Sequence, residues 1–194
     1  MVSPLKTMST KTPPTYLYTT GDLAVRELTI ADEPTMSRWL TDPRILDYWG
    51  GRDHPLDIAG VHQEFFLEPD NNAIQCIVDY RGEPLGYIQF YAAEDEIKLN
   101  NWHVPVEQHV WGIDLFIGEP DYWGKGLGTE LLIATVAYIR RTYHPDKVVI
   151  DPKADNARAI RSYEKAGFRI AKLLPHYEFH EGHYTDNWLM VHEG

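Results

Sequence analysis

DYWGKGLGTELL, residues 121–132, places three glycines and a lysine within five positions in front of an apolar run. This segment consists of Gly124, Lys125, Gly126, Leu127 and Gly128. The run that follows has the spacing of one buried helix face, formed by Leu131, Ala134, Thr135, Tyr138 and Ile139. A helix start leaves its first N–H groups unpaired and partly positive, and glycines let an anion approach them closely. The segment therefore predicts either a phosphate-binding turn that opens a helix or a plain glycine turn in the same place.

The segment differs from two common phosphate-binding patterns. The nucleoside-triphosphate loop requires G-x-x-x-x-G-K-[ST], whereas Lys125 lies between two glycines, and the dinucleotide pattern G-x-G-x-x-G is also unmatched. A phosphate bound at this turn would therefore belong to another class of ligand.

The 194 residues fit one domain, which we place at residues 21–194 after a flexible tail, residues 1–20, that is rich in Thr, Ser and Pro. The tail lacks the continuous apolar region of a signal peptide, and no later stretch is long enough to span a membrane. These features predict a soluble, cytoplasmic protein. Cys76 is the only cysteine, so the sequence offers neither a disulfide framework nor a cysteine metal site.

The charge of the chain narrows its possible partners. The formal net charge of −11 argues against nucleic acid and against an anionic membrane, and it favours a cationic ligand. The nine histidines include no H-E-x-x-H spacing, and His176, His180 and His183 lie in a polar stretch that we expect to be a solvated loop. We therefore expect no bound metal.

Periodicity predicts the order of the other elements. Expected strands cover residues 23–29, 73–80, 84–93, 110–117, 147–151, 168–174 and 187–192. Expected helices cover residues 31–40, 56–67 and 155–167; Asp155 or Asn156 would cap the last of these, and Gly167 would end it. Strands 73–80 and 84–93 would form a hairpin through Arg81 and Gly82. Early hairpins followed by strand–helix–strand order predict an α/β (α+β) mixed sheet of about six to seven strands with helices on both faces.

Asp114 lies in an otherwise apolar strand, residues 110–117. Strict alternation places the apolar side chains of residues 111, 113, 115 and 117 on one side of this strand and Asp114 on the other. Either this carboxylate pairs with a buried donor or it points into a substrate cleft. Asp151 ends another apolar strand just before Pro152, at the carboxyl end where open α/β sheets bind ligands, although a turn-forming role fits equally well.

Two motifs resemble signatures of the GNAT acyl-CoA-dependent N-acetyltransferases. The pattern Q/R-x-x-G-x-G/A corresponds to residues 123–128, with Trp123 as a departure at the first position. The pattern N-x-x-A-x-x-x-Y-x-x-x-G-F is matched by Asn156, Ala159, Tyr163, Gly167 and Phe168. Residues 47–51, 112–129 and 150–168 are more similar to the aminoglycoside 6'-N-acetyltransferases in particular. The resemblance implies a GNAT-like fold from about residue 23 onward and acetyl-CoA as co-substrate.

The resemblance also implies where acetyl-CoA binds. The pyrophosphate would contact Trp123, Gly124, Lys125, Gly126, Leu127, Gly128 and Thr129, the pantetheine arm would contact Leu115, Phe116 and Ile117, and Asn156, Ala159 and Tyr163 would complete the site. Because tryptophan lacks the usual polar group of the first motif position, phosphate contacts would depend on backbone amides and Thr129. Tyr163 would protonate the departing thiolate, unless it only packs with Ala159 and Ile160. A backbone N–H near Leu115 or Phe116 would polarise the thioester carbonyl.

An amine acceptor sets further requirements. A primary amine is mostly protonated near neutral pH and must lose a proton before it attacks a thioester. Asp114 is our candidate to hold the ammonium and to accept that proton, directly or through water, because an aspartate of ordinary pKa is a weak base. By resemblance, the aminoglycoside would contact Trp49, Tyr91, Glu107, Asp114 and Asp151, and Glu94 is a weaker candidate.

The expected activity is therefore acetylation of an aminoglycoside, at its 6'-amine, by a monomer or homodimer that confers antibiotic resistance. One alternative is an N-acyltransferase for a siderophore precursor or a polyamine, because the fold alone does not fix the acceptor. Another is a CoA-binding regulatory module without turnover, which we would expect to lack the carboxylate of Asp114. A protein-modifying acetyltransferase is a third, and it would leave the DYWGG stretch, residues 47–51, without a role.

Overall fold

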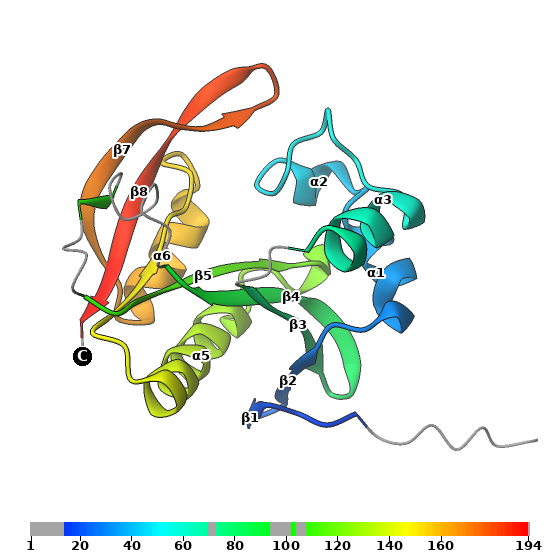
Figure 1. The fold of residues 1–194 in the computed structure, drawn as a ribbon, viewed down its shortest axis with the longest axis horizontal. Coiled ribbons are helices and arrows are strands. Elements are labelled where there is room, and N and C mark those ends of the chain that lie inside the picture. The colour runs from blue at the N-terminus through cyan, green and yellow to red at the C-terminus, as the bar shows by residue number, and fades with distance from the viewer. Residues whose placement is uncertain (1–13, 70–72, 94–101, 104–107, 194) are drawn as a thin grey trace, which may run out of the picture.

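A computed structural model of the chain describes residues 14–69, 73–93, 102–103 and 108–193 (Figure 1). Its eight strands form one mixed sheet in the order β1-β2-β3-β4-β5-β6-β8-β7. The strands are β1 (Tyr18–Thr20), β2 (Leu23–Glu27), β3 (Ala73–Tyr80), β4 (Glu83–Ala92), β5 (Val110–Ile117), β6 (Lys147–Ile150), β7 (Arg169–His180) and β8 (His183–Glu193). The helices are η1 (Ile30–Asp32), α1 (Glu33–Trp39), α2 (Pro43–Leu46), α3 (Ile58–His62), η2 (Gln63–Leu67), η3 (Pro120–Tyr122), α5 (Leu127–Tyr143) and α6 (Ala157–Lys165).

The first five strands form a continuous antiparallel meander. The predicted hairpin joins β3 to β4 through Arg81 and Gly82, which both have positive φ, at +54° and +84°. Two positive φ values in a two-residue turn match the right-handed twist of the strands that it joins. β4 then pairs with β5 from Gly86–Ile117 to Ala92–Trp111, so one edge of β5 is covered along almost its whole length.

The other edge of β5 is covered only at its start. β5 and β6 run parallel and pair at residues 110–112 with residues 147–149, whereas β5 continues to Ile117. The two strands therefore separate at their carboxyl ends, where parallel strands commonly leave a ligand-binding crevice. The same region receives the end of β5, the start of α5 and the start of α6 (Figure 1).

Helices cover both faces of the sheet, as predicted (Figure 1). On one face, α1 to α3 and η2 pack against β3, β4 and β5, for example through Trp39, Val61 and Phe116. On the other face, α5 packs through Leu131 and Ile139. This division follows from strand alternation, because the odd-numbered residues of β5 from Trp111 onward pack with α5, whereas Phe116 packs with α1 to α3.

The fold prediction is confirmed, with one more strand than the six to seven expected. The added strand is β1, at the end of the segment predicted as a tail, where Tyr18–Thr20 pair with β2. The prediction of a solvated loop at His176, His180 and His183 is wrong, because all three residues lie in the long β7–β8 hairpin. His180 is only 7% exposed, since its ring packs close to Gly51.

Two structural findings bear on the predicted absences. No helix in the described part of the chain is long and apolar enough to cross a membrane. Among the described residues, no group of three or more His, Cys, Asp or Glu side chains is arranged to hold a metal ion. Burial raises the pKa of the Cys76 thiol to about 12, so this group is an inert core residue.

Candidate active site

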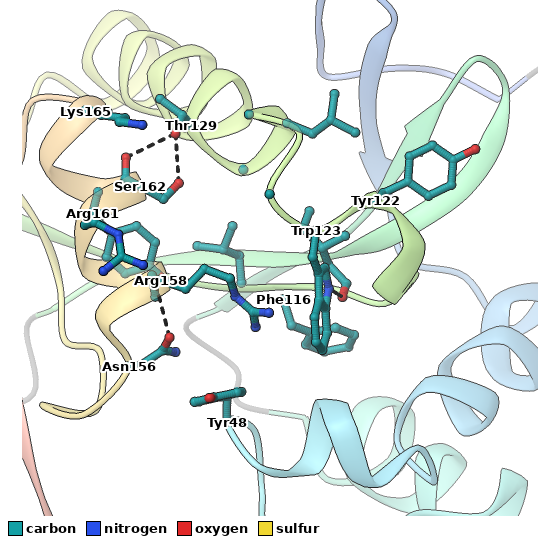
Figure 2. Close-up of a pocket in the computed structure, with 18 of the residues that line it drawn as sticks. Tyr48, Phe116, Tyr122, Trp123, Thr129, Asn156, Arg158, Arg161, Ser162 and Lys165 are labelled. Carbon is teal, nitrogen blue, oxygen red and sulfur yellow. Dashed lines mark hydrogen bonds between the residues drawn. The ribbon is translucent and has the colours of Figure 1, made fainter.

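A cavity of about 300 Å³ opens where β5 separates from β6, between the glycine segment and α6 (Figure 2). The predicted cofactor-binding residues that line it are Leu115, Phe116, Ile117, Trp123, Gly124, Gly126, Leu127, Gly128, Thr129, Asn156, Ala159 and Tyr163. Lys125 is not among the lining residues, because its ammonium lies over the ring of Tyr122, at 4.9 Å from the centroid. We call this space the basic cavity, for the reason given below.

The glycine segment presents backbone N–H groups to the basic cavity. Gly124 and Gly126 have φ of +75° and +85°, which side-chain-bearing residues rarely adopt. Gly126 is the N-cap of α5, and no side chain caps this helix start. The indole N–H of Trp123 donates to the carbonyl of Ile117 at 2.8 Å, which fixes the turn to the end of β5. The uncapped start of α5 therefore has the geometry of an anion site.

Two predicted contact residues also hold the helices in place. The Thr129 hydroxyl lies 2.9 Å from the Ser162 hydroxyl and donates to the Ser162 carbonyl at 3.3 Å, which links α5 to α6 (Figure 2). Asn156 caps α6, since its side-chain oxygen accepts from the N–H of Ala159 at 3.1 Å. The prediction that Asp155 or Asn156 caps this helix is thereby confirmed for Asn156. Gly167 follows the helix with φ of +99°, as expected for its end.

The basic cavity concentrates positive charge. The described residues that line it include four cationic side chains and no Asp or Glu, although the chain as a whole carries a formal charge of −11. Arg158, Arg161 and Lys165 are spaced three and four residues apart on α6, so they share one helix face. Arg44, the fourth, is already paired with Asp42 at 2.6 Å. Sequence analysis missed these cations, although the helical spacing from Asn156 and Tyr163 could have located them.

A second cavity, of about 290 Å³, meets the basic cavity at β5 and is lined by the predicted acceptor residues Trp49, Asp114 and Asp151. Glu178 adds a third carboxylate to its lining, and Lys153 is its one cation among the described residues. We call this space the acidic cavity. The residues that line both cavities are Tyr48, Leu115, Phe116, Asn156 and Tyr163. The two cavities therefore meet at β5 and at the face of α6 that carries Tyr163.

Asp114 lies at the base of the acidic cavity. Alternation along β5 turns it away from the α5 face, as predicted, and register places it opposite Gln89 of β4. The Gln89 amide donates to the Asp114 carboxylate at 2.8 Å, and the hydroxyl of the fully buried Tyr87 donates to the Gln89 amide oxygen at 2.7 Å. The carboxylate therefore pairs with a donor in the sheet and also lines a cavity, and its contact with a substrate stays a prediction.

Tyr163 stays protonated over a wide pH range. Burial raises the pKa of this phenol, and the charges of Asp114 and Asp151 raise the pKa further. Asp114 and Asp151 line the acidic cavity together with Tyr163. A phenol that stays protonated at the junction of two cavities can donate a hydrogen bond to an anion that develops there.

The loop of residues 47–53, which carries the DYWGG stretch, forms one wall of the acidic cavity. Trp49 packs edge-on against Phe116 with ring centroids 5.0 Å apart. The Arg52 guanidinium donates to Glu181 at 2.8 and 3.1 Å, so the tip of the β7–β8 hairpin holds this loop. The buried ammonium of Lys153 donates to the Asp47 carbonyl at 3.3 Å, and burial lowers the pKa of Lys153.

Two predicted acceptor contacts lie elsewhere. Tyr91 is only 4% exposed and does not line the acidic cavity. It faces Gly112, where β5 is still paired with β6, and a Cβ on Gly112 would lie 2.5 Å from its ring. The ring is therefore covered by the sheet rather than presented to a ligand. Glu107 lies outside the described residues, as does Glu94.

Comparison with known proteins identifies the family. The model of the acetyltransferase (GNAT) domain matches residues 29–175. The chain belongs to this family. The acetyltransferase is 33% identical, over 150 residues, to aminoglycoside N(6')-acetyltransferase type 1 of Klebsiella pneumoniae. This alignment covers 75% of this chain and 73% of that protein. It is also 27% identical, over 145 residues, to N(6)-hydroxylysine O-acetyltransferase of Escherichia coli, covering 74% of this chain and 44% of that one.

Solved structures of acetyltransferases have the same fold as this chain. The acetyltransferase superposes with a TM-score of 0.67 and 26% identity on aminoglycoside acetyltransferase AAC(6')-Ib in complex with coenzyme A and kanamycin, covering 88% of this chain and 94% of that one. Spermidine N-acetyltransferase of Vibrio cholerae, at 19% identity and a TM-score of 0.70, covers 88% of this chain and 94% of its own and shares the fold.

Proposed function

We propose that this acetyltransferase transfers the acetyl group of acetyl-CoA to the 6'-amine of an aminoglycoside, by direct attack in a ternary complex, and thereby confers antibiotic resistance. One observation carries the proposal: a cavity lined by cations and a cavity lined by carboxylates meet at β5 and Tyr163. CoA is a polyanion and an aminoglycoside is a polycation. Each substrate therefore fits one cavity by charge, and the reacting groups meet where the cavities join.

The donor occupies the basic cavity. Its pyrophosphate lies at residues 124–129, where the N–H groups at the start of α5 are uncapped. Its pantetheine arm lies along residues 115–117, on the edge of β5 that β6 leaves uncovered. A backbone N–H near Leu115 or Phe116 polarises the thioester carbonyl, because an N–H donor stabilises the negative charge that develops on this oxygen.

The acceptor occupies the acidic cavity, and Trp49, Asp114 and Asp151 contact it. Asp114, oriented by Gln89, holds the ammonium and takes up its proton directly or through water. The neutral nitrogen attacks the thioester carbon, the C–N bond forms, and the C–S bond breaks with its electron pair leaving on sulfur. Tyr163 then protonates the departing thiolate, and the proton that the nitrogen loses as the amide forms returns Tyr163 to its protonated state. The basic α6 residues do not enter this step, because they line the part of the basic cavity that holds the phosphates.

Buried Lys153 favours a second candidate acceptor. A buried ammonium in the acidic cavity would repel a polycation, but it would pair with the carboxylate of an acceptor derived from an amino acid, such as a siderophore precursor. The likeness to the hydroxylysine O-acetyltransferase supports the same alternative. In this case Asp114 would hold the amine or hydroxylamine end of the acceptor, and Lys153 would hold its carboxylate.

A thiol-release assay with acetyl-CoA distinguishes the two candidate acceptors. The panel holds aminoglycosides with a 6'-amine, matched aminoglycosides with a 6'-hydroxyl, polyamines and N6-hydroxylysine. We expect turnover with the first group, acetyl on the 6'-nitrogen, and weaker acceptor binding at higher salt, because ammonium–carboxylate pairs in an open cleft are screened. Acetylation at another position, or turnover with none of the aminoglycosides, would contradict the proposal; turnover with hydroxylysine alone would support the second candidate.

A further inference from the structure

We propose that Arg158 is the residue that binds the diphosphate of CoA, with its guanidinium positioned by contact with the rings of Trp123 and Tyr48. The proposal rests on the proposed use of acetyl-CoA and adds a residue that neither signature motif specifies. It concerns the place where the glycine segment departs from its family pattern, because the one polar group of the Trp123 side chain, its indole N–H, already donates to the Ile117 carbonyl.

The aromatic rings position the guanidinium. The Arg158 Cζ atom lies 3.9 Å from the centroid of the Trp123 ring and 5.4 Å from that of the Tyr48 ring (Figure 2). Trp123 is itself fixed, because its indole N–H donates to the Ile117 carbonyl at 2.8 Å. A guanidinium that lies over an aromatic ring keeps its N–H donors in its own plane, where they can still point at a ligand. The rings therefore reduce the entropy that Arg158 would lose on binding an anion.

The guanidinium of Arg158 is also available. Among the described residues, none forms a hydrogen bond or an ion pair with it, in contrast to Arg44, which is bound to Asp42. Arg158 lines the basic cavity next to the uncapped start of α5. A planar guanidinium has five N–H donors in a fork that matches two phosphate oxygens. The α5 N–H groups and Arg158 therefore approach one anion from two sides.

Arg161 and Lys165 line the same cavity but lack this arrangement. They follow Arg158 on the same face of α6, about 4.5 Å and 10.5 Å further along the helix axis at 1.5 Å per residue. No ring contact holds either side chain among the described residues. We therefore assign the diphosphate to Arg158 rather than to the cationic face as a whole.

Calorimetry with CoA tests this assignment on the full chain. Arg158→Gln should weaken CoA binding about 10- to 100-fold, the usual worth of charge-assisted hydrogen bonds. The matched control is Arg141→Gln, which removes the same charge from the exposed face of α5, outside the cavity, and should leave CoA affinity within about twofold. Equal affinity of the Arg158→Gln and Arg141→Gln proteins for CoA would overturn the proposal. A loss of CoA affinity in Arg161→Gln as large as that in Arg158→Gln would also overturn it, because it would show that the cations of α6 act through their summed charge.

Two further experiments test which phosphate group Arg158 contacts and whether an aromatic ring positions it. With 3'-dephospho-CoA, which keeps the diphosphate, Arg158→Gln should cause the same fold loss as with CoA; disappearance of the loss would assign Arg158 to the 3'-phosphate and overturn the proposal. Tyr48→Leu should weaken CoA binding, and adding it to Arg158→Gln should cause little further loss, because Tyr48 acts by holding Arg158. Simple addition of the two losses would contradict this role of Tyr48.

A wild-type chain that binds no CoA would instead refute the proposed function, along with this inference. Far-ultraviolet circular dichroism and a melting curve on each variant exclude unfolding as the cause of a loss. Arg158→Lys provides a folded variant that keeps the charge without the planar fork, and we expect it to recover only part of the affinity.

Discussion

Gly126→Ala tests whether the glycine segment binds an anion or only shapes a turn. Gly126 has φ of +85°, and a Cβ added there would meet no protein atom within 4 Å. The substitution therefore causes backbone strain but no clash with the protein. A residue with a Cβ in this conformation costs about 1–2 kcal/mol, which for a chain of this size lowers the melting temperature by about 2–8 °C.

Gly82→Ala is a matched control for that strain. Gly82 lies in the β3–β4 turn, far from the basic cavity in sequence, with φ of +84° and no atom within 4 Å of an added Cβ. Both substitutions should therefore lower the stability of the apoprotein by the same amount. The added methyl group at Gly126 lies at the uncapped helix start, where it would also meet a bound pyrophosphate.

Calorimetry should then separate the two variants. Loss of one charge-assisted contact is worth about 1.5–3 kcal/mol, so CoA should bind Gly126→Ala at least about 10-fold more weakly than Gly82→Ala. Melting curves with and without CoA give a second measure, since CoA should raise the melting temperature of Gly82→Ala more than that of Gly126→Ala. Equal CoA affinity in the two folded variants would refute the anion-site reasoning and leave the glycine segment as a plain turn.

Three further predictions concern the junction of the cavities and the loop of residues 47–53. Asp114→Asn keeps an oxygen that can accept from Gln89 but removes the charge, so kcat/KM should fall about 10²–10⁴-fold with CoA affinity unchanged by calorimetry. Nearly full activity between about pH 6 and 9 would contradict this role and make Asp151 the next residue to test. Tyr163→Phe should lower kcat in steady-state assays without raising the KM for the acceptor, and an unchanged kcat would exclude proton donation from Tyr163. The Arg52 guanidinium lowers the pKa of Glu181 to about 2 from its ordinary value of 4.5, so their ion pair stabilises the fold above about pH 4.5 and is lost as pH falls toward 2. Melting temperatures over this range should fall more steeply in the wild type than in Glu181→Gln, and equal slopes would contradict the linkage.

The parts of the site that could be predicted from the sequence depend on local periodicity. The glycine segment and α5 follow from a helix face, and the orientation of Asp114 follows from the two-residue repeat of β5. The α6 cap at Asn156 and the glycine at its end follow from known helix-end preferences. Each of these features is decided within about ten residues, so a single sequence contains the necessary information.

The parts of the site that could not be predicted from the sequence depend on contacts between distant segments. Gln89 reaches Asp114 only through the β4–β5 register, and Lys153 enters the acidic cavity through its bridge to Asn187 of β8. The β7–β8 hairpin extends through a polar, histidine-containing stretch because its tip packs on the loop of residues 47–53, where Arg52 binds Glu181. A polar stretch that pairs with itself across a turn has no apolar repeat, so periodicity predicts a loop there.

The separation of charge between the two cavities that meet at β5 would let one acidic chain bring together the polyanion and the polycation of the proposed reaction. A net charge of −11 disfavours CoA at long range, so the phosphates need a local excess of cations with no carboxylate among them, and the described lining of the basic cavity meets this condition. Leu115 and Phe116, which line both cavities, form an apolar boundary where the cavities meet. In the proposed complex, the sign of the charge would therefore change at the thioester. Under the proposed function, Asp114 would hold the acceptor while its amine is protonated. Once the amine loses its proton that hold would weaken, and the neutral nitrogen could attack across this apolar boundary.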